Sequence, residues 1–389
     1  MTQAVLALAD GTVFEGVSVG VEGKIAVGEV VFNTSMTGYQ EILTDPSYAF
    51  QLVALTCCHI GNTGVNTQDM ESSRVFASGL IIRDASIAVS NYRAQGSLAN
   101  FLMEQQVVAI AEIDTRALTH LLRDKGAQAG VIMVGQDIDI PDGIKMAREF
   151  SSIAGKDLVR LVTCQKPYFF KQKNWFPSNS VKTPSTSLLH PTTSYKVVVY
   201  DFGVKKQILC ALVDQGCEVV VIPATTSVED ALAYQPDGIL LSNGPGDPQP
   251  CDYAIKTTQM FLERGLPVLG ICLGHQLLGL ALGARTKKIK FGHHGANHPV
   301  LNKRDGRVWI TSQNHGFVVD EESLPDDVEV THLSLFDGSL QGMRLKNKPV
   351  FSFQGHPEAS PGPQESSALF NQFIDSVSYT HLRAHETEA

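Results

Sequence analysis

The second half of the chain alternates between short apolar runs and longer amphipathic stretches. The apolar runs that predict buried strands lie at 197–201, 218–223, 238–243 and 267–271. The amphipathic stretches that predict helices lie at 204–215, 228–234 and 252–263. Apolar strands separated by helices are typical of a parallel sheet that is covered on both faces. We therefore predict an α/β domain over 196–377, with its ligand site beyond the carboxyl ends of the strands.

The first half has more β-branched runs and less helical periodicity. Strands are predicted at 28–32, 51–55 and 76–82, and helices at 98–104 and 115–125. This mixture predicts an α+β domain over 1–150. Segment 151–195 contains Pro177, Pro184 and Pro191 among Ser, Thr, Lys and Asn, which predicts a linker or a crossing segment.

Composition narrows the class of protein. The chain has 389 residues, 43% of them hydrophobic and 18% charged, as expected for a globular protein of two or three domains. The net charge of −9 argues against a nucleic-acid partner, and no apolar run approaches the roughly 20 residues of a membrane span. The first apolar stretch has no basic flank, which predicts a strand and not a signal peptide. Seven cysteines without regular spacing predict a reducing compartment, and we expect the cytoplasm.

Cys272 is the first candidate for chemistry. It follows the strand predicted at 267–271 in a G-x-C-x-G pattern and precedes an apolar helical stretch. This is the strand–turn–helix setting of a nucleophile elbow, in which the helix N-terminus favours the thiolate. The alternative is a buried cysteine at a strand end, because free Cys packs like a small hydrophobe.

His356 and Glu358 follow another predicted strand, at 350–354. Side chains two residues apart in an extended segment face the same side, so the carboxylate can orient the imidazole. With Cys272 they would supply a nucleophile, a general base and an orienting acid. Taken singly, His356 could be a surface loop histidine and Glu358 a helix N-terminal acid.

These residues carry a family resemblance. The segment 270–276 together with 356–358 resembles the class I (triad) glutamine amidotransferases. Segments 32–48, 59–66, 113–119 and 291–300 resemble the small subunit of carbamoyl-phosphate synthetase, and the likeness covers roughly 1–375. The resemblance implies hydrolysis of L-glutamine through a thioester on Cys272. Residues 378–389 depart from the family pattern, and we expect them to be a non-native tail.

The glutamine site can be predicted in the same way. The N–H of Leu273, the residue after the nucleophile, is the natural first oxyanion donor. The resemblance implies a second oxyanion donor at Gly244 and the remaining contacts with the substrate, which come from Ser47 in the N-terminal half and from Gly246, Gln276, Asn314, Gly316 and Phe317. We expect 312–317 to be a loop, because Asn-His-Gly is turn chemistry. His315 matches no triad role.

No phosphate-binding G-x-x-x-x-G-K-[ST] loop occurs in the chain. We therefore expect no cofactor here. The resemblance implies that ATP and Mg²⁺ bind to a large partner subunit, which receives the ammonia and makes carbamoyl phosphate. A higher oligomer of small–large heterodimers is expected. His293, His294 and His298 lie in one glycine-rich loop without a Cys or carboxylate at ligand spacing, and we expect no metal site.

Three other functions would also use parts of this pattern. The first is the glutaminase component of anthranilate synthase, against which the roughly 190 residues before the α/β domain argue. The second is a docking subunit without activity, which the presence of all three triad residues disfavours. The third is an independent thiol hydrolase acting on γ-glutamyl compounds.

Overall fold

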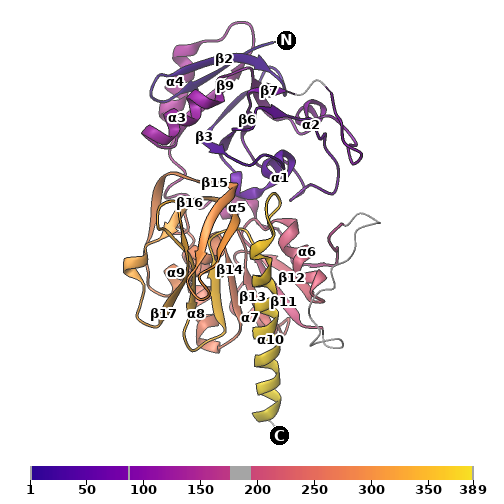
Figure 1. The fold of residues 1–389 in the computed structure, drawn as a ribbon, viewed down its shortest axis with the longest axis vertical. Coiled ribbons are helices and arrows are strands. Elements are labelled where there is room, and N and C mark those ends of the chain that lie inside the picture. The colour runs from indigo at the N-terminus through magenta and orange to yellow at the C-terminus, as the bar shows by residue number, and fades with distance from the viewer. Residues whose placement is uncertain (1, 86–87, 176–193, 388–389) are drawn as a thin grey trace. The chain divides into compact units, whose positions relative to one another are not determined.

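The computed structural model describes residues 2–85, 88–175 and 194–387 (Figure 1). The chain forms two compact units. The first comprises Met1–Lys156, Lys288–Asn297 and Ser360–Gly362, and the second comprises Asp157–Lys287, His298–Ala359 and Pro363–Ala389. Two short pieces of the C-terminal half therefore belong to the first unit, which the hydrophobic pattern did not predict.

The first unit is built on a closed barrel with the strand order β1-β2-β8-β6-β4-β3-β9. Its elements are β1 Gln3–Leu8, β2 Val13–Ser18, β3 Ile25–Asn33, α1 Tyr39–Thr44, η1 Pro46–Tyr48, β4 Gln51–Leu55, β5 His59–Ile60, β6 Gly79–Ile81, β7 Asp84–Ala85, α2 Leu98–Glu104, β8 Val108–Ala111, α3 Thr115–Lys125, β9 Gln128–Val134 and α4 Ile140–Glu149.

The barrel explains the short β-branched runs of the first half. Leu52 of β4 is buried in one apolar cluster with Leu118 and Leu122 of α3, whereas its neighbour Val53 is buried in another with side chains of α1 and α2. Successive side chains of a strand point to opposite faces, so a strand that is covered on both faces is apolar throughout. The mixed α+β composition was predicted, but barrel closure was not.

The second unit is built on a ten-stranded sheet with the order β10-β12-β11-β13-β14-β19-β18-β17-β15-β16. Its elements are α5 Val159–Val162, β10 Tyr168–Phe170, β11 Lys196–Asp201, α6 Lys206–Asp214, β12 Glu218–Pro223, α7 Val228–Leu232, β13 Gly238–Leu241, α8 Asp252–Arg264, β14 Val268–Ile271, α9 Leu273–Ala281, β15 Thr286–Asn302, β16 Val308–Val319, η2 Glu321–Ser323, β17 Val328–Ser334, β18 Leu340–Leu345, β19 Val350–Phe353, η3 Glu365–Ser367 and α10 Ala368–Thr387.

Helices cover both faces of the parallel part of this sheet (Figure 1). On β11, Val197 and Val199 pack with side chains of α6 and α10, and Val198 and Tyr200 pack with side chains of α8 and α9. Strands β12, β11, β13, β14 and β19 are parallel, as the strand–helix alternation predicted. The carboxyl ends of four of them, β11, β13, β14 and β19, lead directly to Lys205, Gly244, Cys272 and His356.

Two segments outside the predicted domains contain helix or strand. Within 151–195, α5 forms a short helix and β10 pairs antiparallel with β12 at the edge of the sheet. The three prolines of that segment lie outside the described residues. At the other end of the chain, α10 continues to Thr387 and so includes most of the stretch expected to be a tail.

Candidate active site

Cys272 lies in the tight turn between β14 and α9, where the elbow was predicted. Its backbone has φ 53° and ψ −103°, a conformation that is costly for any residue with a Cβ. A Cβ on Gly270 would lie 2.6 Å from the carbonyl oxygen of Gly274, and one on Gly274 would lie 2.1 Å from that of Leu241. The two glycines of the G-x-C-x-G pattern are therefore required because backbones approach closely on both sides of the nucleophile.

Backbone hydrogen bonds fix this turn to the neighbouring strands. The N–H of Cys272 donates to Phe353 O at 2.9 Å, and the N–H of Gly274 donates to Ser242 O at 3.0 Å. The N–H of Leu273 lies between these two donors, at the first position of α9. It is therefore well placed to serve an oxyanion that forms beside Cys272.

Gly244 lies against the same turn. A Cβ at this position would be 2.2 Å from Phe202 O and 2.8 Å from Leu273 Cδ2. Only glycine allows this approach. The structure thus brings together the two residues that we predicted to bind the oxyanion.

His356 and Glu358 form the hydrogen bond that the i, i+2 spacing predicted. His356 Nδ1 lies 2.7 Å from Glu358 Oε1, and both side chains are buried. The backbone N–H of His356 donates to Ser312 O at 2.9 Å, which fixes the loop after β19 to β16. Because Nδ1 is occupied by the carboxylate, Nε2 is the ring nitrogen left for proton exchange with Cys272.

Lys205 is a member of this site that sequence reasoning missed. Its Nζ donates to Glu358 Oε1 at 2.9 Å and to Ala359 O at 2.8 Å, and its side chain is 3% exposed. The loop that presents it is shaped by Asp201, whose Oδ1 accepts the N–H groups of Gly203 and Val204. The available signal was its position after a strand of the parallel sheet, on the edge that carries Cys272.

The charges of these groups depend on one another. Burial alone would lower the pKa of His356, but the Glu358 carboxylate and the Cys272 sulfur outweigh it and raise that pKa well above its ordinary value. Burial alone would raise the pKa of Glu358, but the Lys205 ammonium and His356 hold it well below its usual range. The arrangement favours an imidazolium between a carboxylate and the sulfur that becomes the nucleophile.

The segment 312–317 is a strand, so the prediction of a loop is wrong. It belongs to β16, which pairs at the edge of the sheet, and pairing overrides the turn tendency of Asn-His-Gly. The strand nevertheless reaches the nucleophile, because Asn314 O lies 3.5 Å from Cys272 Sγ. A Cβ on Gly316 would meet no protein atom within 4 Å.

Gln276 fixes this strand from α9. Its Nε2 donates to Phe317 O at 2.8 Å and to Gln354 Oε1 at 3.1 Å, and the side chain is buried. Gly246 has φ 81°, and a Cβ there would lie 3.1 Å from Leu158 Cδ1. The roles of Gln276, Asn314, Gly316, Phe317 and Gly246 in binding glutamine stay predictions.

Ser47 belongs to the first unit. It lies in η1, directly after α1, and its N–H donates to Asp45 Oδ1 at 2.8 Å. This bond is the capping interaction of a short turn, made by the Asp45 side chain and the backbone of Ser47. A contribution of Ser47 to the glutamine site also stays a prediction.

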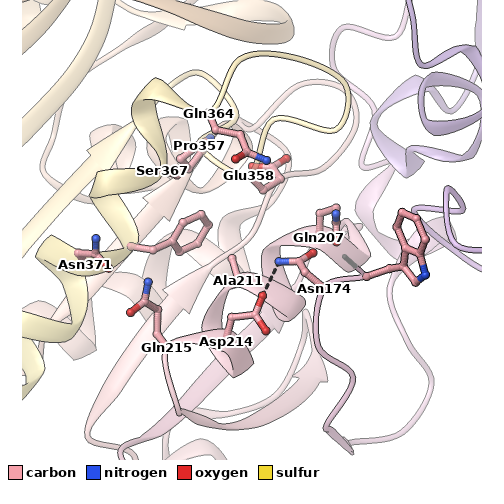
Figure 2. Close-up of a pocket in the computed structure, with 12 residues that line it drawn as sticks. Asn174, Gln207, Ala211, Asp214, Gln215, Pro357, Glu358, Gln364, Ser367 and Asn371 are labelled. Atoms are coloured by element: carbon pink, nitrogen blue, oxygen red, sulfur yellow. Dashed lines mark hydrogen bonds between the residues drawn. The ribbon is translucent and has the colours of Figure 1, made fainter. Parts of the chain in front are cut away.

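A polar cavity of about 230 Å³ reaches Glu358 from another direction (Figure 2). Figure 2 shows Asn174 donating to Asp214, at 2.7 Å, while Gln364 and Ser367 lie on the side of Glu358. Neither Cys272 nor His356 lines this cavity. We therefore do not assign it to the reacting glutamine.

No group of three His, Cys, Asp or Glu side chains that could hold a metal ion occurs within 2–85, 88–175 and 194–387. His294 offers its backbone oxygen to the N–H of Thr34 at 3.1 Å, and the His298 ring meets Phe336 edge-on. His294 and His298 thus make ordinary contacts of a folded chain.

Comparison with known proteins agrees with this geometry. Residues 198–376 match the family "Glutamine amidotransferase class-I", and residues 6–132 match "Carbamoyl-phosphate synthase small chain, CPSase domain". The chain is 56% identical over 374 residues to the carbamoyl phosphate synthase small chain of Vibrio cholerae, covering 96% of this chain and 98% of the relative.

The chain belongs to the carbamoyl phosphate synthase small-chain family. The small chain of Vibrio vulnificus is 57% identical over the same length and coverage. That of Ralstonia nicotianae is 56% identical over 370 residues, covering 95% of this chain and 96% of the relative. The predicted family and fold class are thereby confirmed, and the anthranilate synthase alternative fails on the match over 6–132. The match to the class I glutamine amidotransferase family ends at residue 376, within α10.

Proposed function

We propose that this small chain hydrolyses L-glutamine at Cys272 and passes the ammonia to the large subunit of carbamoyl phosphate synthase. The observation that carries the proposal is the strained elbow at Cys272 on the same sheet edge as the buried His356–Glu358–Lys205 cluster. A docking subunit without activity would have no need of a strained nucleophile or of a buried ion-pair chain beside it.

The first half of the reaction breaks the amide bond. The Cys272 thiolate attacks the side-chain carbonyl carbon of glutamine, and the N–H groups of Leu273 and Gly244 stabilise the oxyanion. The C–N bond then breaks, and His356 gives its proton to the nitrogen, which leaves as ammonia. The product on the protein is a glutamyl thioester. The raised pKa of His356 suits this step, because the ring keeps its proton until the C–N bond of glutamine breaks.

The second half releases glutamate. A water molecule attacks the thioester carbon, and His356, now neutral, takes the proton from the water. The carbon–sulfur bond breaks and the thiolate is restored, paired again with the imidazolium. Glu358 and Lys205 keep their charges throughout and act by orienting the ring and by stabilising its charged form.

The ATP and Mg²⁺ of carbamoyl phosphate synthesis belong, in this proposal, to the large subunit. Direct transfer of ammonia from the glutamine site to the large subunit is physically reasonable. Ammonia released into water at neutral pH would be mostly ammonium, which is not a nucleophile. None of the helices in the described ranges has the length and apolar character needed to span a bilayer. The seven cysteines all lie in the described ranges and none of them forms a disulfide, which suits the cytoplasm we propose. The higher oligomer remains a prediction.

The test is ammonia release from glutamine, measured with and without the large subunit, for the wild-type chain and Cys272→Ala. We expect Cys272→Ala to abolish glutamine hydrolysis, while the complex still makes carbamoyl phosphate from added ammonium. Loss of both activities in a folded complex would contradict the division of labour. Rapid hydrolysis of other γ-glutamyl compounds by the isolated chain would instead support the independent hydrolase.

A further inference from the structure

The segment that directly follows Glu358 has a strained backbone. Glu358 is followed by Ala359 with φ 60° and Ser360 with φ 49°, both in the left-handed region that side chains disfavour. Between these two residues the chain passes from the second unit to the first. Such conformations are unfavourable and persist only where the surroundings hold them.

On the triad side, Lys205 holds this segment. Its Nζ donates to Ala359 O at 2.8 Å and to Glu358 Oε1 at 2.9 Å. The position of Ala359 and the position of the triad carboxylate are therefore set by one ammonium group. A movement of Ala359 would disturb the hydrogen bond on which His356 depends.

On the side of the first unit, Glu71 holds the segment. The hydroxyl of Ser360 donates to Glu71 Oε1 in a short hydrogen bond, and Glu71 is 1% exposed. The N–H of Glu71 in turn donates to Thr44 Oγ1 at 2.9 Å. Thr44 is the last residue of α1, and its hydroxyl donates to Gln40 O one turn earlier. Glu71 thereby connects Ser360 to α1.

The other end of α1 contacts the next residue of the same segment. A Cβ on Gly38, which precedes α1 with φ 82°, would lie 2.3 Å from Pro361 Cβ. The helix thus holds Pro361 directly at its start, and Ser360 through Glu71 at its end. Two contacts of different kinds fix consecutive residues of the segment, as a strained conformation requires.

We propose that Glu71 is a positioning residue for glutamine hydrolysis. Its hydrogen bond to Ser360 holds the strained backbone at Ala359. This backbone in turn keeps Glu358 and His356 correctly positioned for reaction with Cys272. The inference rests on the proposed glutaminase function. Two peptide bonds of the chain connect Glu358 to Ser360, the residue that Glu71 binds.

The experiment uses the complete complex with the large subunit and compares Glu71→Ala, Glu71→Gln, Ser360→Ala and the Glu71→Ala/Ser360→Ala double variant. We expect Glu71→Ala to lower the glutaminase kcat about ten- to a hundredfold, with little change in the KM for glutamine. The alkaline limb of kcat should move to lower pH, because a displaced Glu358 supports the charge of His356 less well. Glu71→Gln keeps an acceptor oxygen for Ser360 and should retain most of the activity.

The double variant tests the bond itself, since it should lose no more than either single variant. Asp69→Ala is the matched control: it removes a carboxylate from the same loop, one paired with Arg93 and not with Ser360, and should leave kcat unchanged. Should Glu71→Ala fail to fold, Ser360→Ala removes only a hydroxyl and tests the same contact.

An unchanged kcat and pH profile in folded Ser360→Ala and Glu71→Ala complexes would overturn the proposal. So would additive losses in the double variant, or an equal loss of ammonia-dependent synthesis, which would mark a general structural role. Failure of the glutaminase function itself would be seen separately, as a wild-type complex that releases no ammonia from glutamine.

Discussion

Replacement of Glu358 by Gln isolates the electrostatic part of the mechanism. Gln keeps the side-chain volume and an oxygen that can accept from His356 Nδ1, but it removes the charge shared with Lys205. The carboxylate raises the pKa of His356, so its removal lowers that pKa. The imidazolium should then lose its proton at a lower pH than in the wild type.

The size of the effect follows from the geometry. The carboxylate and imidazolium are hydrogen-bonded at 2.7 Å, and their delocalised charges lie farther apart, at about 4 Å. With an effective dielectric constant of about 20, this pair interacts by about 4 kcal/mol, which corresponds to about a thousandfold in rate. Because Gln retains the hydrogen bond, we expect a fall in kcat of about a hundredfold. His356→Ala loses the proton carrier and should cost on the order of ten-thousandfold, with Glu358→Ala between the two.

The assay is ammonia release from glutamine by the complex, with kcat and kcat/KM followed from neutral to alkaline pH. Glu358→Gln should shift the alkaline limb to lower pH as well as lower the maximum. Ammonia-dependent carbamoyl phosphate synthesis by the same preparation serves as the control for folding and assembly.

Three results would refute the reasoning. One is an alkaline limb that does not move, which would mean that Glu358 does not act on the charge of His356. Another is a shift to higher pH, which has the opposite sign. The third is a loss in Glu358→Gln or Glu358→Ala as large as in His356→Ala, with intact folding, because an orienting group should cost less than the proton carrier.

Two further predictions concern Ser47 and two glycines of the second unit. Ser47→Ala should raise the glutamine requirement about ten- to a hundredfold, since a hydrogen bond to a charged group contributes roughly 1.5–3 kcal/mol, while ammonia-dependent synthesis and melting temperature stay nearly unchanged. A lowered melting temperature with unchanged glutamine dependence would indicate that Ser47 has only a structural role, in the turn that follows Asp45. Gly274→Ala should destabilise the fold by about 3 kcal/mol or more in thermal unfolding, because its Cβ would lie 2.1 Å from Leu241 O, whereas Gly316→Ala should leave the melting temperature unchanged. Equal melting temperatures for the two glycine variants would contradict the close-approach argument.

The sequence determined the local elements of the site because their signals are local. An apolar strand that runs into G-x-C-x-G requires a tight turn, and the two glycines are where backbones approach within the distance of a Cβ. The i, i+2 spacing of His356 and Glu358 was enough to predict their hydrogen bond. Strand–helix alternation was enough to predict parallel pairing, because only a sheet covered on both faces tolerates uniformly apolar strands.

Tertiary structure alone decided the contacts between distant segments. Lys205 precedes Glu358 by 153 residues, and no spacing rule connects them. They meet because β11 and β19, which are separated by β13 and β14 in the sheet, end on the same side of it. Residues 312–317 form a strand despite their turn-forming sequence, because pairing at the sheet edge provides hydrogen bonds for their backbone. The hydrogen bond between Ser360 and Glu71, which lies 289 positions earlier in the chain, likewise follows from no local sequence pattern. Such contacts depend on which elements pack together, and this is settled by burial over the whole unit and not by any segment alone.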